Sequence, residues 1–365
     1  MDTLQNLLEP VIDPEEGTPL ASQKAWRSND LLTLYFQRPS VPRSPRIDIL
    51  AQVLFGKLTL PSPYHADAFV VFSQAIPSES LGFVDPKAHE LSVSVGDKHF
   101  TIRQSRSLLT SNRKEGTTGA VVWKVTPLFA EWISSPDNVL TKHGCLGPES
   151  TAIGLKVVIL PHALLTLLDS SELGAGVSGV VALSLGPSIR RYIATDQDYA
   201  IKLLQQNIAE NLPAVSSSTS TSARTKQRSK KKTNNNRDIA SQASLTNIET
   251  LELDWEEDSI SSLPSLLNLN DRGVDLVIAC DCIYNEALIE PLNSTCAQIC
   301  RLRTSTGSQT PTICLVAQQL RSPDVFESWL KSFHAMFHVW KVPDELLAEG
   351  LRENSGFIVH LGIAR

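Results

Sequence analysis

A glycine-rich segment at residues 172–179, with the sequence Glu-Leu-Gly-Ala-Gly-Val-Ser-Gly, is the strongest constraint on the fold of this chain. Asp196 follows Gly176 by twenty residues, at the end of a short apolar run over 191–195. In a βαβ unit such glycines permit a sharp turn from strand to helix and close approach of the backbone to a ligand. The acid that ends the next strand accepts hydrogen bonds from ribose hydroxyls. The spacing therefore predicts a nucleotide-binding pocket on a parallel sheet.

The charges around this segment distinguish between nucleotide ligands. No lysine or arginine lies between Lys156 and Arg190, and Glu172 opens the segment. A pyrophosphate at the helix N-terminus would be repelled by that carboxylate, whereas the ammonium and sulfonium groups of S-adenosylmethionine would be attracted by it. The charges thus favour S-adenosylmethionine over a dinucleotide. An ordinary strand-to-helix turn whose glycines serve packing is the remaining alternative.

The composition is that of a folded protein that stays inside the cell. A chain of 365 residues with 42% hydrophobic content can bury a sizeable core. The net charge of −6 argues against a cationic surface that wraps nucleic acid, and no apolar stretch is long enough to span a membrane. The six cysteines lack the paired spacing of zinc or disulfide frameworks. Because the N-terminus lacks a secretory signal, we expect a cytoplasmic protein.

The chain divides into two parts at about residue 115. Residues 1–115 form an N-terminal extension, and residues 116–365 form the main domain. Within the main domain, residues at about 214–245 are rich in Ser, Thr, Asn and Lys and predict a disordered insertion. Its basic run at 226–232 is a candidate nuclear signal or RNA contact, although a solvated charge block is the simpler interpretation.

Two local patterns predict structure before the glycine segment. The alternating runs 90–95 and 99–102 are joined by Gly96-Asp97 and predict a β-hairpin. Residues 120–133 place large apolar side chains at helical spacing and predict a helix that enters the main domain.

From Ile153 onwards the pattern predicts a helix, a strand at 167–171, the glycine loop and then alternating helices and strands. The later elements comprise strands at 191–195, 250–253, 274–279 and 312–317, a helix at 325–333, and closing strands at 337–342 and 357–363. Because no long helix joins the last two strands, we expect them to pair antiparallel as a final hairpin. We therefore expect an α/β fold with a Rossmann-like, seven-stranded class I methyltransferase sheet and an N-terminal β-rich extension.

The residues just after each strand are the candidates for chemistry, because open parallel sheets bind ligands beyond the carboxyl ends of their strands. Trp255 could stack on an adenine ring, with simple packing as the alternative. Asp281-Cys282-Ile283-Tyr284 lies where methyltransferases of this fold hold the atom that accepts the methyl group. Asp281 and Tyr284 are therefore the candidate catalytic residues. Methyl transfer needs an aligned, neutral nitrogen, which makes positioning and electrostatics the main contributions. The absence of two prolines after Asp281 argues for an aliphatic amine rather than a nucleobase amine.

Four stretches resemble the methyltransferase-like 21 family of protein-lysine methyltransferases: 117–123, 172–176, 253–255 and 275–284. The resemblance spans about residue 80 to the end and is most specific in the Asp-Trp and Asp-x-x-Tyr segments. It implies contacts to S-adenosylmethionine at Trp123, Gly174, Ala175, Gly176, Asp196, Trp255 and Cys280. It also implies methyl transfer to a lysine ε-amine, in one branch of the family on a large-subunit ribosomal protein.

Two other functions remain open at this point. An NAD-dependent oxidoreductase would share the glycine loop and Asp196, and would bind NAD but not S-adenosylmethionine. A methyltransferase-like scaffold would bind a ribosomal partner without turnover, although the presence of both Asp281 and Tyr284 argues against it.

Overall fold

The computed structural model describes residues 71–73, 76, 82–106, 120–155, 177–217, 247–253, 260–266, 273–283, 285–304 and 311–365. A seven-stranded sheet lies at its centre, in the order β5-β4-β3-β6-β7-β9-β8. The strands are β3 (Thr151–Leu155), β4 (Arg191–Asp196), β5 (Ile248–Glu252), β6 (Leu276–Cys280), β7 (Ile313–Gln319), β8 (Phe337–Lys341) and β9 (Phe357–Ala364). Strands β3 to β7 pair in parallel, whereas β9 is antiparallel to both β7 and β8. The predicted seven-stranded sheet and its antiparallel end are confirmed.

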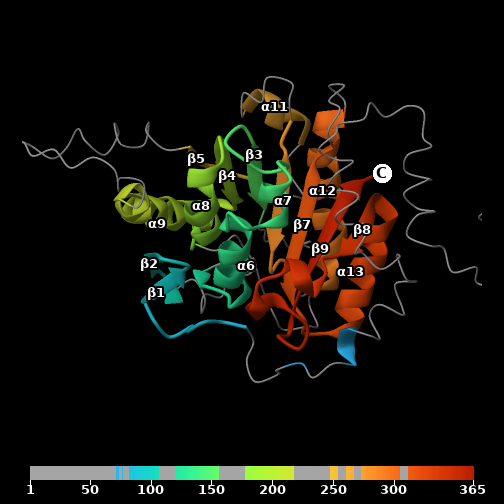
Figure 1. Ribbon diagram of the computed structural model, residues 1–365, viewed down its shortest axis with the longest axis horizontal. Coiled ribbons are helices and arrows are strands. Elements are labelled where there is room, and N and C mark those ends of the chain that lie inside the picture. The colour runs from blue at the N-terminus through green and yellow to red at the C-terminus, as the bar shows by residue number, and fades with distance from the viewer. Residues whose placement is uncertain are drawn as a thin grey trace, which may run out of the picture.

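Helices cover both faces of this sheet (Figure 1). On one face α6 (Val125–Ser134), α8 (Val180–Leu185) and α9 (Asp198–Ser217) pack in a core with the strands, and on the other α12 (Ile289–Thr304) and α13 (Pro323–Met336) form a second core. Residues of β7 alternate between the two, with Leu315 in the first core and Val316 in the second. This burial on both faces explains why the first five residues of β7, 313–317, are all apolar.

The remaining elements are short. They are α7 (Val139–Lys142), α11 (Leu263–Leu266) and the 3-10 helices η2 (Gly186–Ser188), η4 (Ile260–Ser262), η5 (Glu286–Leu288), η6 (Asp344–Leu346) and η7 (Glu349–Leu351). None of the helices in the described part of the chain has the length and hydropathy to cross a membrane.

The predicted hairpin is present as β1 (Glu90–Val95) and β2 (Lys98–Arg103), which pair antiparallel around the turn at Gly96-Asp97. It lies beside α9 (Figure 1). The inward side chains of both strands, among them Val93 and Phe100, belong to the same hydrophobic core as α6, α8 and α9. The hairpin therefore folds against the main domain. The predicted division at residue 115 falls outside the described residues.

The structure differs from the sequence prediction at the start of the sheet. Residues from Ile153 were expected to be helical, but Thr151–Leu155 form the strand β3 between β4 and β6. A short apolar run cannot be assigned to helix or strand from periodicity alone. This one is a strand because it pairs in parallel with β4 on one side and β6 on the other. The strand expected at 167–171 lies outside the described residues. At the other boundary, α9 continues to Ser217, so the beginning of the predicted insertion is helical.

Gly179, which precedes α8, has a left-handed backbone with φ of 59°. A Cβ atom there would lie 2.9 Å from Ile208 Cγ1 and 3.1 Å from Leu204 Cδ1 of α9. Gly179→Ala is therefore expected to lower the free energy of unfolding by about 2 kcal/mol, through backbone strain and overpacking. Urea denaturation would measure this. Gly147→Ala is the control, because a Cβ at that glycine meets no atom within 4 Å; equal stability of the two variants would contradict the prediction.

Candidate functional site

The candidate site lies at the carboxyl-terminal edge of the parallel strands. Asp196 is the last residue of β4, and Asp281 directly follows the last residue of β6. Because β4, β3 and β6 pair in parallel, both acids lie at the same edge of the sheet. This is the edge at which open α/β sheets bind ligands.

A cleft with about 410 Å³ of empty space opens beside this edge. Sheet residues Gly154, Ala194 and Cys280 form its floor, and Ser178 and Gly179, at the start of α8, form part of its wall. Most of the lining is apolar.

Tyr192, from β4, also lines the cleft and is fully buried. Burial, and to a lesser extent the neighbouring Cys280 thiol, raise the pKa of Tyr192, so its phenol stays neutral and protonated at physiological pH. The close contact of its hydroxyl with Gly154 leaves no room for a side chain there, because a Cβ on Gly154 would lie 2.3 Å from the Tyr192 oxygen.

Two buried polar groups at this edge of the sheet have no hydrogen-bond partner among the described residues. They are the indole Nε1 of Trp123 and the hydroxyl of Thr126, which itself lines the cleft. Buried donors that lack a partner are costly, and a polar ligand is one way to satisfy them. The surroundings of Trp123, which the resemblance implied as a cofactor contact, thus fit a group with hydrogen-bond acceptors such as S-adenosylmethionine.

Asp196 and Cys280, two further predicted cofactor residues, are both buried at the same edge. Asp196 Oδ1 accepts a hydrogen bond from the backbone N–H of Gln197 at 2.7 Å. Cys280 lines the cleft as the last residue of β6. The structure therefore brings Trp123, Asp196 and Cys280 to one edge of the sheet.

Asp281, the predicted catalytic acid, is held in a fixed geometry. Its backbone has φ of 59°, which is rare outside glycine, and its side chain is 1% exposed. The guanidinium of Arg321 binds both carboxylate oxygens, with Nη1 to Oδ1 at 2.8 Å and Nη2 to Oδ2 at 2.6 Å. The backbone N–H of Gln319 donates to Oδ1 at 3.2 Å. Such a bidentate pair fixes the plane of the carboxylate as well as its position.

Arg321 in turn is held by the chain around it. Its guanidinium carbon lies 4.8 Å from the centre of the Trp123 ring, and its Nη2 donates to Gln319 Oε1 at 3.0 Å. The ring of Phe83 packs on Trp123 with 4.4 Å between centroids. Phe83 belongs to the extension and pairs with Trp123 as an isolated β-bridge. The N-terminal extension therefore supports the Asp281–Arg321 pair.

Sequence reasoning missed Arg321. It lies two residues beyond the end of β7, so the rule that singled out Asp281 applied equally to the residues after β7. The predicted cofactor residues Gly174, Ala175, Gly176 and Trp255, and the predicted catalytic residue Tyr284, lie outside the described residues.

Sequence comparisons identify the relatives of this chain. Residues 226–327 match a family described as lysine methyltransferase. Ribosomal lysine N-methyltransferase 5 of Zygosaccharomyces rouxii is 30% identical over 236 residues, which cover 64% of this chain and 70% of the relative. The protein of the same name from Saccharomyces cerevisiae is 30% identical over 70% of this chain and 77% of its own length. The Vanderwaltozyma polyspora protein is 28% identical over 78% and 90%.

Solved structures are more distant. A putative methyltransferase complexed with SAH aligns with a TM-score of 0.36 at 6% identity, over 76% of this chain and 56% of that one. The family of this protein is therefore identified from the sequence relatives. With a relative at 30% identity that is matched over 70% of its length, the chain belongs to the ribosomal lysine N-methyltransferase 5 family of lysine methyltransferases.

Proposed function

We propose that this lysine methyltransferase, which takes its methyl group from S-adenosylmethionine, acts on a lysine of a large-subunit ribosomal protein. The relatives are named for a ribosomal substrate. The single observation that carries the catalytic part of the proposal is the buried Asp281–Arg321 pair beside a cleft at the carboxyl edge of the sheet.

The cofactor would be held by Trp123, Thr126, Asp196 and Cys280, together with the glycine segment at 174–176. Bound S-adenosylmethionine supplies an electrophilic methyl group. Trp123 and Thr126 offer the polar groups without partners noted above, and Asp196 is a buried acid that can accept hydrogen bonds. The apolar lining of the cleft keeps water away from the reacting atoms.

Asp281 would orient the incoming lysine amine. A carboxylate has about four acceptor positions, and in this structure Oδ1 accepts two hydrogen bonds, whereas Oδ2 accepts one, from Arg321. Among the described residues, no second group occupies Oδ2, and we propose that an N–H of the substrate does. Tyr284, three residues further on, would shape the channel that the lysine side chain enters.

The charge of the pair matters as much as its geometry. An isolated buried carboxylate would favour the ammonium form of the lysine, which has no lone pair to attack the methyl group. Arg321 balances the charge of Asp281, so the pair as a whole does not favour the ammonium form. The amine can then be oriented by a hydrogen bond and still lose its proton.

A labelling experiment tests the proposal. Purified protein, methyl-labelled S-adenosylmethionine and ribosomal large subunits from cells that lack the enzyme are incubated together. We expect one labelled large-subunit protein, and label that accumulates about a hundredfold more slowly with Asp281→Asn. A label on another class of protein would overturn the proposed substrate. Cofactor binding without any labelled protein would instead support a scaffold or a small-molecule acceptor.

A further inference from the structure

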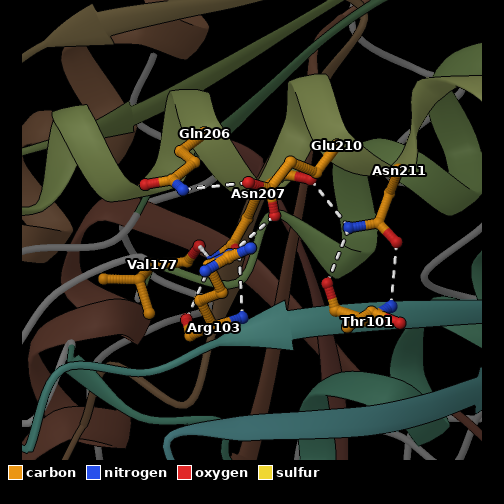
Figure 2. Close-up of polar contacts among 7 residues, drawn as sticks. All are labelled: Thr101, Arg103, Val177, Gln206, Asn207, Glu210 and Asn211. Atoms are coloured by element: carbon orange, nitrogen blue, oxygen red, sulfur yellow. Dashed lines mark hydrogen bonds and ion pairs between the residues drawn. The ribbon is translucent and has the colours of Figure 1, made fainter.

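Helix α9 completes the hydrogen bonding of the edge strand β2 with two asparagine side chains (Figure 2). Asn207 Oδ1 accepts from the Arg103 N–H at 2.9 Å, and its Nδ2 donates to the Arg103 carbonyl at 2.9 Å. One turn further along, Asn211 repeats this pattern on Thr101, at 2.8 Å and 2.9 Å. The two amides thus take the place of a neighbouring strand. Both asparagines are buried.

Asn207 makes one contact that Asn211 does not. Its Nδ2 also donates to the backbone carbonyl of Val177 at 2.6 Å (Figure 2). Val177 directly follows the predicted cofactor loop, and the next two residues, Ser178 and Gly179, line the cleft. The second hydrogen bond from Asn211 instead goes back into α9, to the carbonyl of Asn207 at 2.8 Å.

The same turn of α9 packs tightly on the end of the loop. The close approach of Ile208 to Gly179, described above, places α9 against the residues that line the cleft. Val177 is itself fully buried, so its carbonyl cannot turn to water if Asn207 is lost. The position of the loop end therefore depends on one amide that also holds the hairpin.

We propose that Asn207 is a positioning residue for the cofactor: it fixes residues 177–179, which lead into α8 and line the cleft, against the β1–β2 hairpin, and the hairpin thereby supports cofactor affinity. This inference rests on the proposed function, because it takes the cleft as the cofactor site. An amide is suited to this position since it donates to two carbonyls and accepts from an N–H at the same time. Neither a carboxylate nor an aliphatic side chain can do so.

Asn207→Ala and Asn211→Ala form a matched pair that tests the proposal. Each variant removes two hydrogen bonds to β2, but only Asn207→Ala removes the contact to Val177. Isothermal titration calorimetry measures the dissociation constant for S-adenosylmethionine, and thermal unfolding measures stability. Both variants are expected to unfold at lower temperature. Asn207→Ala should weaken cofactor binding about tenfold, the cost of one buried carbonyl left unpaired in the loop, and Asn211→Ala should not.

Amide hydrogen exchange separates failure of this inference from failure of the proposed function. In Asn207→Ala, the amides of 178–183 should exchange about tenfold faster than in Asn211→Ala, with or without cofactor. If the unmodified protein binds no S-adenosylmethionine, the proposed cofactor site is wrong, and the exchange result still decides whether Asn207 holds the loop. Equal cofactor affinities and equal exchange in the two variants would overturn the role of Asn207.

Discussion

Asp281→Asn is expected to lower the rate of methyl transfer about a hundredfold, the size of effect that loss of one positioned electrostatic contact produces in enzymes. The amide keeps the shape of the carboxylate but replaces one oxygen with an N–H group. It can no longer bind Arg321 through two acceptors or accept a hydrogen bond from the substrate amine at Oδ2. The dissociation constant for S-adenosylmethionine should change less than about threefold, because Asp281 is not among the residues that line the cleft.

The residue just before β6 provides a suitable control for Asp281, which just follows it. Asp275 precedes β6 and forms an ion pair with Arg303, and its Oδ2 accepts from the Thr151 N–H at 2.7 Å. It therefore resembles Asp281 in chemistry but lies at the opposite edge of the sheet. Asp275→Asn should lower stability and leave transfer by the folded enzyme unchanged. Equal losses of turnover in both variants, measured with folded protein at saturating cofactor, would show that Asp281 acts only through stability.

Much of this fold follows from local patterns in the sequence. The hairpin at 90–103 was predictable because alternating side chains flank a Gly-Asp turn, and β6 because it is uniformly apolar and buried on both faces. The antiparallel end of the sheet followed from the lack of a long helix between β8 and β9. Each of these signals is contained within a few neighbouring residues.

The helix predicted from Ile153 was wrong because the structure there depends on pairing with distant strands. Thr151–Leu155 is a strand because β4 and β6 bond to it on both sides, and no local periodicity records that. The contacts of Asn207 are similar. Its partners Arg103 and Val177 are 104 and 30 residues away in the sequence, so an asparagine in a helix gave no sign of its role.

The candidate site was partly predictable for a general reason. Asp196 and Asp281 could be selected because each ends or follows a strand, and carboxyl ends of parallel strands meet at one edge. Cys280 was implied only by the resemblance to a known family. The partner of Asp281 could not be chosen in this way alone, because several basic residues follow structural elements. The hydrogen bonds from Arg321 to both carboxylate oxygens, and its position over the Trp123 ring, show that Arg321 is the one directed at the acid.

Arg321→Met is expected to have the largest effect on stability among the variants of this site. It leaves a carboxylate with 1% exposure without its ionic partner, and loss of one member of a buried pair costs about 3 kcal/mol or more. The flexible methionine can preserve the contact with Trp123, so the change isolates the charge. Urea unfolding measures the loss, and initial rates of transfer on the folded protein measure the catalytic part.

The double variant Asp281→Asn/Arg321→Met separates the two effects. It removes both charges, so no uncompensated carboxylate remains, and its stability should recover by about 2 kcal/mol relative to Arg321→Met alone. Methyl transfer should not recover, because the acceptor oxygen for the amine is still changed. Recovery of both properties together would mean that the pair is structural and that the substrate amine is oriented elsewhere. Recovery of stability alone is the result that a catalytic Asp281 held in place by Arg321 requires.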